Sequence, residues 1–500
     1  MKPRFSQICG AANQAAASYS VKGLIALLVV VLLSGCGGGG GSSFSGNTNV
    51  TLFMTGSAND VFTVFAVGIN QLTLTDRNGK TVNLLTAPGG PESIHLNGVL
   101  EPWTTVSIPQ GVYTSASITP AGAGYLCAGL DPSANWIDLA DAYIPQLPAD
   151  SAVVKLASPI TVTGENMGLV LDLLVNQSVT FTPPCWKVGG AGIITFSPLF
   201  ALDPLSNSGQ NIGTENVSGL QGVVASVASS GSFTVAAMEY ITWQVTTNAG
   251  TSFQGITSSP QIAVGMPVEF DGTVQPDGSL AATRVEAYDT DSSTPTVIIG
   301  PLLTTNQSGG DPDTKGHVLY VSKGLSQSNV KGLGNFPMWD YSSATFQISG
   351  RLSNLKNLPF TPSFSAVTMV TGQEVAVASN VSSFPHQDSY GNPEPAAATV
   401  TLVPQTINGT VTGIANEGSF TTYTVTLANY DLFPDLAAEP GPVSTLQSPS
   451  TVVVYADSST QQLNTNPIAV GSVVRFYGLV FNDNGTLRMD CAQINDGVPE

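Results

Sequence analysis

The chain has 500 residues, more than one hydrophobic core usually holds, so we expect several domains. Only 10% of the residues are charged and the net charge is −19, a balance that repels phosphate backbones and argues against nucleic-acid binding. An apolar content of 42% excludes a disordered chain, and strand-forming residues separated by many glycines (52) and prolines (33) predict an all-β protein.

The first predicted element is a signal segment. The first 22 residues carry three basic and no acidic side chains, and the apolar run at 24–33 is about half as long as a membrane-spanning helix. This combination is typical of a secretory signal. The sequence Leu-Ser-Gly-Cys at 33–36 resembles the lipobox of bacterial lipoproteins. The resemblance implies cleavage before Cys36 and attachment of lipid, including palmitate, to that cysteine.

The leader predicts where the protein is located. Residues 1–35 are expected to form the signal peptide and residues 36–48 a tether rich in glycine and serine. Several acyl chains on Cys36 would hold a membrane stably, since each buried methylene contributes ~0.8 kcal/mol. Gly37 stands where an aspartate would favour retention in the inner membrane, so we expect an exported protein on the outer membrane. The sequence does not distinguish its periplasmic face from its surface face.

Residues 49–205 are predicted to form the first domain. Alternating apolar and polar residues at 66–75 predict a strand, and Asn78-Gly79 predicts the tight turn of a hairpin. The nearly apolar run at 167–175 indicates a central strand. Asp172 inside that run is interpreted as an acceptor of hydrogen bonds rather than as a catalytic acid or ligand.

Three segments of this domain carry a family resemblance. They are PQGVY at 109–113, ASPITV at 157–162 and GLVLDLLVNQSV at 168–179. Together they resemble DUF4382, a family of unknown function that occurs in bacterial lipoproteins. The resemblance implies a β-sandwich and brings no established activity.

The first domain also holds the candidate disulfide and the candidate binding residue. Cys127 and Cys185 would meet oxidising conditions after export, and a bridge between them would stabilise the fold by ~4 kcal/mol. The alternative is two buried free thiols, and Cys491 is left without an expected partner. Trp136 lies in a polar insert, where it is a candidate for an exposed ring that stacks on a sugar; the alternative is a core position.

Two similar segments follow a polar linker predicted at 206–217. Residues 218–295 and residues 406–500 share the sequence Gly-Ser-Phe-Thr and a late hairpin turn, Asp-Gly in the first segment and Asn-Gly in the second. Both segments resemble DUF5666, another family of unknown function, which implies a small barrel like the oligonucleotide/oligosaccharide-binding fold. The paired positions are Gly222 with Gly409, Gly265 with Gly471, Phe270 with Phe476, and Gly272 with Gly478.

Residues 296–405 resemble the same module more weakly. Gly372 and the alanine-rich run at 396–400 stand in corresponding places, but a long insert replaces the tight hairpin. We expect a degenerate module there and leave open whether it is a true third copy. The predicted architecture is therefore all-β, an N-terminal β-sandwich followed by two or three small β-barrel modules.

Recognisable catalytic patterns are missing from the sequence. The three histidines lie in separate segments without metal-ligand spacing, so no metal or other cofactor is predicted. We expect a non-enzymatic envelope protein that binds, adheres or spaces, with the membrane lipid as one partner and an envelope glycan or protein as another. The alternatives are a carbohydrate-binding protein or carboxylate-dependent hydrolase, and a solute-binding component with a cleft between the first two domains. The oligomeric state is not predicted.

Overall fold

A computed structural model describes most of the chain beyond residue 43. The lipidation candidate Cys36 and the disulfide candidate Cys185 lie outside the described residues, and only the backbone is described at Cys127 and Trp136. Residues 46–500 form one unit by their mutual contacts. The described residues are 44–58, 62–90, 93–94, 96–97, 99–131, 136–144, 146–182, 193–205, 216–228, 231–237, 241–288, 296–303, 317–319, 322–326, 338–339, 341, 343–350, 355–379, 397–428, 432–438, 446–464 and 466–498.

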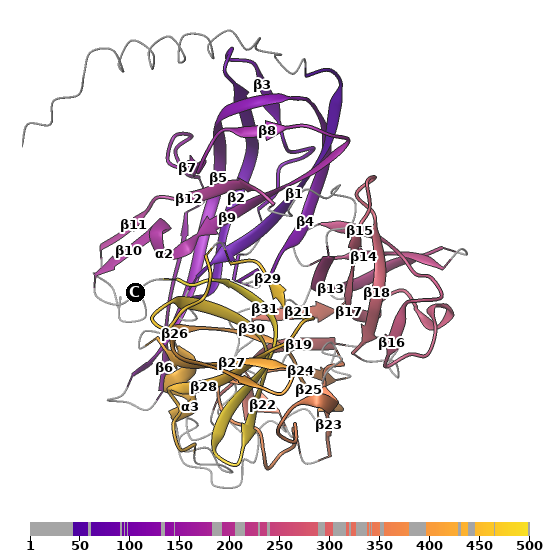
Figure 1. Cartoon of the computed structure of the whole chain (residues 1–500), viewed down its shortest axis with the longest axis vertical. Coiled ribbons are helices and arrows are strands. Elements are labelled where there is room, and N and C mark those ends of the chain that lie inside the picture. Colours follow the sequence, from indigo (N-terminus) through magenta and orange to yellow (C-terminus); the bar gives the residue numbers. More distant parts are fainter. Residues whose placement is uncertain are drawn as a thin grey trace, which may run out of the picture. The chain divides into compact units, whose positions relative to one another are not determined.

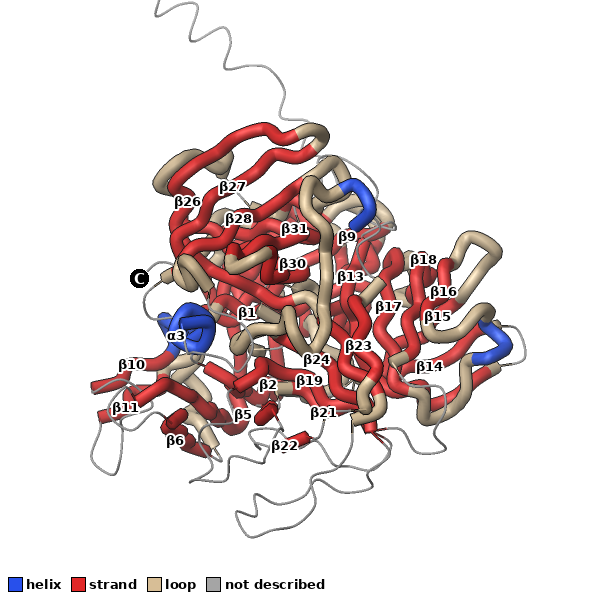
Figure 2. Tube along the Cα trace, turned by 90° about the horizontal axis from the view of Figure 1, so that it is seen from below, coloured by secondary structure: helices blue, strands red, loops and turns tan. Residues whose placement is uncertain are grey.

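The predicted all-β class is confirmed. Strands make up most of the described trace, and two small five-stranded sheets close into barrels (Figures 1 and 2). The helical elements are short: α2 (Val175–Ser178), α3 (Leu432–Ala438), and the 3-10 turns η3 (Ser259–Gln261) and η5 (Leu355–Asn357). Within the described residues, no helix has the length and apolar character that crossing a membrane would require.

Two sheets in the N-terminal part share one core. Apolar residues from both sheets are buried in a single cluster that includes Leu52, Phe65, Ile118, Ile160, Leu171 and Phe200. The first sheet has the order β4 (Glu101–Pro109), β1 (Asn47–Ser57), β9 (Asn166–Leu174), β12 (Leu199–Pro204) and β7 (Val153–Lys155). The second has the order β3 (Thr81–Asn83), β2 (Phe62–Asp76), β5 (Gly111–Asp131) and β6 (Trp136–Ile144), with β8 (Ile160–Val162) also on β5. A separate hairpin joins β10 (Val179–Thr182) and β11 (Ile193–Phe196).

The expected central strand and the expected hairpin are both present. Strand β9 lies between β1 and β12, which explains its apolar sequence. The turn between β2 and β3 has Gly79 at φ +81°, and the Gly79 amide donates to the Asp76 carbonyl. The simple alternation expected for 66–75 is wrong, because Val67, Ile69, Leu72 and Leu74 are all buried. The register of β2 against β5 shifts between residues 69 and 71, and this bulge turns both sets of apolar side chains toward the core.

The first barrel closes through one parallel pair of strands. Each strand in the ring pairs with the next, and β15 closes the ring by pairing parallel with β18. Phe233, Phe270 and Val285 fill the interior. In ring order the strands are β13 (Asn216–Val227), β14 (Ser232–Ala236), β15 (Thr242–Thr246), β18 (Leu280–Ala287) and β17 (Pro267–Val274); β16 (Ser252–Gln254) lies outside the ring on β18.

The C-terminal barrel repeats this topology strand for strand. Its ring is closed by the parallel pair β28 and β31, and a short outer strand again pairs with the last strand of the ring. In ring order the strands are β26 (Gln405–Glu417), β27 (Phe420–Leu427), β28 (Thr451–Ala456), β31 (Thr486–Asp496) and β30 (Val473–Asp483); the outer strand is β29 (Gln461–Gln462).

The middle region has strands that correspond to the central strands of the two barrels, but in the described residues they do not form a closed ring. Strand β19 lies between β21 and β24, β24 pairs antiparallel with β25, and β23 pairs parallel with β25. Among the described residues, no strand pairing closes this sheet into a ring. Its strands are β19 (Thr296–Leu303), β20 (His317–Leu319), β21 (Lys323–Ser326), β22 (Met338–Trp339), β23 (Thr345–Ile348), β24 (Glu374–Ser379) and β25 (Thr399–Leu402).

One glycine turn occurs three times. Gly265, Gly372 and Gly471 precede β17, β24 and β30, with φ of +89°, +88° and +94°. Each glycine amide donates at 2.8 Å to a carbonyl of the first strand of its sheet, and the same strand residue donates back to the residue after the glycine. Only glycine adopts this backbone conformation without steric cost. The middle region therefore shares a local structure with the two barrels.

Candidate functional site

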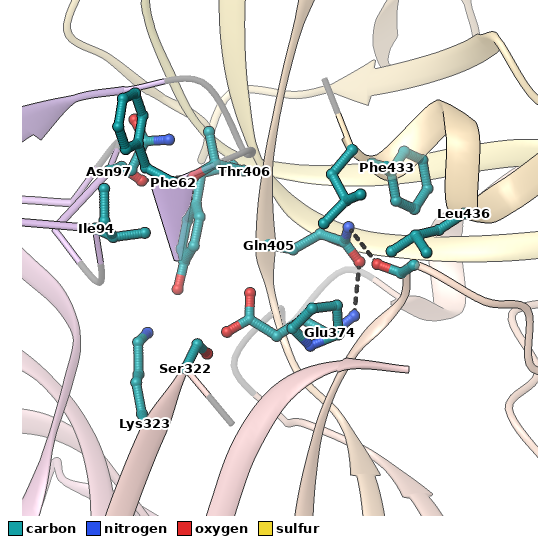
Figure 3. A pocket seen from close by; sticks show the side chains of 14 residues that line it. Phe62, Ile94, Asn97, Ser322, Lys323, Glu374, Gln405, Thr406, Phe433 and Leu436 are labelled. Atoms are coloured by element: carbon teal, nitrogen blue, oxygen red, sulfur yellow. Dashed lines mark hydrogen bonds between the residues drawn. The ribbon is translucent and has the colours of Figure 1, made fainter. Parts of the chain in front are cut away.

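A cavity of about 110 Å³ opens between segments that are far apart in the sequence (Figure 3). Its walls come from the N-terminal sheets, the middle region and the C-terminal barrel with α3. The wall surface is mostly apolar. The two charged side chains lie on the side formed by β21 and β24, whereas the polar residues Asn97, Gln405, Thr406 and Tyr477 come from other elements. The apolar lining residues are Phe62, Ile94, Pro301, Leu432, Phe433 and Leu436.

Strand pairing brings a lysine and a glutamate to the same wall. Lys323 begins β21 and lies opposite Ile299 of β19, while Glu374 begins β24 and lies opposite Pro301 of the same strand. Residues two apart on a strand point to the same face, and residues opposite each other across an antiparallel pair share that face. Lys323 and Glu374 therefore flank β19 on one side of the sheet, and both line the cavity.

Hydrogen bonds from the C-terminal barrel position Glu374. The side-chain amide of Gln405 accepts from the Glu374 backbone N–H at 2.9 Å and donates to the Gly372 carbonyl at 3.2 Å. The neighbouring Thr406 hydroxyl donates to the Asn97 carbonyl at 2.5 Å. The backbone around Glu374 is thus held by the barrel that follows it in the chain.

The charge of Glu374 is balanced by its surroundings. Burial raises the pKa of the Glu374 carboxyl, while the Lys323 ammonium and a hydrogen bond from Ser322 oppose that rise. In the described part of the chain, no ion pair joins Lys323 to Glu374. Figure 3 shows the Lys323 amine and the Glu374 carboxylate on either side of the Ser322 hydroxyl, directed into the same space. The arrangement offers one cation and one anion to a molecule inside the cavity.

A second group of charges lies in the first barrel. The Arg284 guanidinium contacts Glu269 at 2.5 Å, Glu286 at 2.7 Å and Asp271 at 2.8 Å. The side chains of Glu269 and Glu286 are 0% and 1% exposed, and that of Asp271 is 16% exposed. We call these four residues the Arg284 cluster. One guanidinium for three carboxylates leaves an excess of negative charge in a buried place.

Hydroxyl groups and an amide compensate part of that excess. The Tyr288 hydroxyl donates to Glu269 at 2.7 Å, and the Gln221 side-chain amide donates to the same carboxylate at 2.8 Å. The Ser349 hydroxyl from the middle region donates to Glu286 at 2.7 Å. Burial and the charge of Glu269 raise the pKa of Glu286, whose second carboxylate oxygen is buried without a hydrogen-bond partner in the described structure. Burial likewise raises the pKa of Tyr288 well above its ordinary value. All three carboxylates contact the Arg284 guanidinium, so we interpret this cluster as structural.

Asp172 accepts a hydrogen bond, as expected from the sequence. The Ser57 hydroxyl donates to it at 2.7 Å, and burial raises its pKa while the charge of Arg475 opposes the rise. Arg475 itself donates to the Gly56 carbonyl at 2.8 Å and to the Asn97 side chain at 2.7 Å. A buried arginine of the C-terminal barrel thus contacts the N-terminal sheets beside Asp172.

The described residues that line the cavity include none of the candidates named from the sequence. The lipidation site Cys36 and the disulfide pair Cys127 and Cys185 cannot be assessed from the described side chains, and neither can the exposure of Trp136. Cys491, which has no expected partner in the sequence, is a buried free thiol in the core of the C-terminal barrel.

Sequence reasoning missed the two charged residues of the cavity. Lys323 and Glu374 belong to no motif and are separated by a long stretch of chain. One signal was available for Glu374: an acidic residue directly follows the Gly372-Gln373 turn and opens an otherwise apolar strand. No comparable signal marks Lys323.

A comparison with known protein families identifies one of the predicted β modules. Residues 221–286 match the domain of unknown function DUF5666. This range begins within β13, ends one residue before the end of β18, and includes every member of the Arg284 cluster. The resemblances to DUF4382 and to a lipoprotein gain no support from this comparison and stay predictions. A search of curated proteins found no match. The first closed barrel of the chain is a DUF5666 domain.

Proposed function

We propose that this protein is an exported, lipid-anchored component of the cell envelope that binds a small solute and catalyses no reaction. The observation that supports binding is the cavity of about 110 Å³, where a mostly apolar wall surrounds a few convergent polar groups. Small-molecule sites have this composition. Because three parts of the chain supply the wall, an occupant would contact all of them.

The composition of the cavity favours binding over hydrolysis. A glycosidase mechanism requires two carboxyl groups facing one space. Among the described residues that line this cavity, Glu374 is the only acid. The three acids around Arg284 are engaged with the guanidinium instead of facing a cleft. The carbohydrate-active alternative therefore has no observation in its favour here.

The anchoring part of the proposal depends on Cys36 and its flanking sequence. Cells that express the chain and are fed a palmitate analogue should incorporate the label, and Cys36→Ala should abolish both the label and membrane association. A matched Cys9→Ala variant should retain both, since residue 9 lies in the predicted leader. A mature protein that keeps residues 1–35 and carries no lipid would contradict the anchor without bearing on the cavity.

The binding part is tested by thermal unfolding with a panel of small solutes. The panel contains amino acids, monocarboxylates, primary amines and monosaccharides, each at millimolar concentration. At least one class should raise the melting temperature, because a solute that binds only the folded state stabilises it. Ser322→Phe, which fills the cavity from its polar side, should abolish the shift, whereas the exposed control Ser458→Phe should preserve it. If no class shifts the melting temperature, or if the filled variant responds equally, the cavity is not a binding site.

A further inference from the structure

We infer that the ligand of this cavity is a small zwitterion of the α-amino acid class, with its carboxylate against Lys323 and its ammonium against Glu374. The inference rests on the proposed binding function and names its ligand. Four features of the cavity support it: the separation of the two charges, the engagement of the other polar groups, the volume, and the apolar wall.

A single ligand can contact both charged side chains, Lys323 and Glu374. Lys323 and Glu374 face the same space from the two edges of β19, and the described structure contains no ion pair between them. The lysine ammonium has three hydrogens to donate and the carboxylate has only acceptors. A ligand that bears a carboxylate and an ammonium on adjacent atoms satisfies both groups at once. A ligand with a single charge leaves one of them desolvated and unpaired, which is costly.

Three of the remaining polar residues of the wall, Gln405, Thr406 and Ser322, use their polar atoms within the protein. Gln405 uses its amide oxygen for Glu374 N–H and its NH₂ group for the Gly372 carbonyl. The Thr406 hydroxyl donates to the Asn97 carbonyl, and the Ser322 hydroxyl, with its single hydrogen, donates either to the Ile299 carbonyl at 3.0 Å or to Glu374. A sugar needs several uncommitted donors and acceptors for its hydroxyls. This wall offers a cation and an anion instead.

The volume limits the size of the ligand. A cavity of about 110 Å³ provides several water-sized volumes, at roughly 10–15 Å³ each. That space suits a small molecule such as alanine or valine.

The apolar wall accounts for the side chain of such a ligand. Leu432, Phe433 and Leu436 of α3 line the cavity, with Pro301 of β19 and Phe62 of β2. Burying one methylene group contributes ~0.8 kcal/mol. An aliphatic side chain is therefore favoured over a polar one at this site, and valine should bind more tightly than serine.

Isothermal titration calorimetry of the exported chain tests the inference. The probes are L-valine, L-alanine and L-serine, the single-charge analogues isobutyrate and isobutylamine, and glucose. L-Valine should bind at least tenfold more tightly than either single-charge analogue. Lys323→Met and Glu374→Gln should each weaken L-valine binding at least tenfold, while the exposed controls Lys155→Met and Glu165→Gln should leave it unchanged. Far-ultraviolet circular dichroism shows whether each variant retains its β structure.

A charge swap keeps the inference falsifiable if a single variant folds poorly. The double variant Lys323→Glu/Glu374→Lys preserves one cation and one anion, so it should recover L-valine binding relative to a single reversal that folds. Equal affinity for isobutyrate and L-valine would overturn the zwitterion while leaving the binding function intact. Glucose binding without L-valine binding would do the same. Failure of every probe would overturn the inference and count against the proposed function as well.

Discussion

Replacing Arg284 by methionine should destabilise the first barrel by about 3–5 kcal/mol at pH 7. Methionine preserves much of the side-chain volume and removes the charge, so Glu269 and Glu286 keep their buried positions without a counter-ion. Breaking a buried pair by removing one partner costs about that much. Asp271 adds little to the loss, because its side chain is 16% exposed and water screens it. We therefore do not add the three contacts together.

The loss should depend on pH in a defined direction. Without the guanidinium, the two buried carboxylates have raised pKa values in the folded chain, so the folded state binds protons that the unfolded state releases. Stability then falls as the pH rises through that window, and the loss at pH 8 should exceed the loss at pH 5.

Hydrogen exchange measured by mass spectrometry across a urea titration resolves the effect by region. Peptides from β13 and β17 should lose protection at lower urea in the Arg284→Met variant, while peptides from β26 and β30 change less. The matched control is Arg488→Met, because the ion pair of Arg488 with Asp483 is about a quarter exposed and should be worth about 1–2 kcal/mol with its ring contacts. Equal losses in the two variants, or a loss that grows toward pH 5, would refute the reasoning.

Three further predictions concern other parts of the chain. Gly409→Ala should cost about 1–3 kcal/mol, because the added Cβ meets the Thr426 carbonyl of the neighbouring strand β27. Gly413→Ala on the same strand meets only ordinary contacts and should cost nothing, and urea denaturation compares the two variants. Glu374→Gln should raise the melting temperature at pH 7 and should not raise it below the ordinary glutamate pKa. The reason is that burial raises the pKa of Glu374, with a smaller contribution from the charge of Glu269, although Lys323 and Ser322 oppose the rise. A pH series of melting curves that shows the reverse order would contradict this. Cys491 should resist iodoacetamide in the folded protein and react on unfolding, because burial raises the pKa of its thiol; mass spectrometry of native protein labelled at that residue would disprove it.

Much of the fold was predictable because its determinants are local. Asn78-Gly79 and the glycine before β17 or β30 specify turns through their own backbone preferences, and such signals can be read within a few residues. The repeat between the barrels was visible for the same reason. The bulge in β2 was not predictable, because the register of β2 depends on β5, a strand that the local pattern does not contain.

The cavity was not predictable from the sequence. Lys323 and Glu374 become neighbours only because β19 pairs with β21 on one edge and with β24 on the other. Its apolar wall adds residues from the N-terminal sheets and from α3, which the predicted all-β pattern did not include. Long-range pairing of this kind leaves no periodic signal at the residues that it brings together.

The correspondence of the middle region with the barrels was predictable only in part. Gly372 was recognised from the sequence, but Gly300 was not, although it lies opposite Val375 just as Gly222 lies opposite Val268 and Gly409 opposite Val474. The surrounding sequence at Gly300 has diverged, so the equivalence appears only once the strands are paired.

A crystal structure of the chain grown with saturating L-valine tests the central claim most directly. The account predicts one amino acid in the cavity, with its carboxylate about 2.7–3.2 Å from Lys323 Nζ and its ammonium at a similar distance from the Glu374 carboxylate. A cavity that holds only water under those conditions, or L-valine bound elsewhere on the molecule, would contradict it.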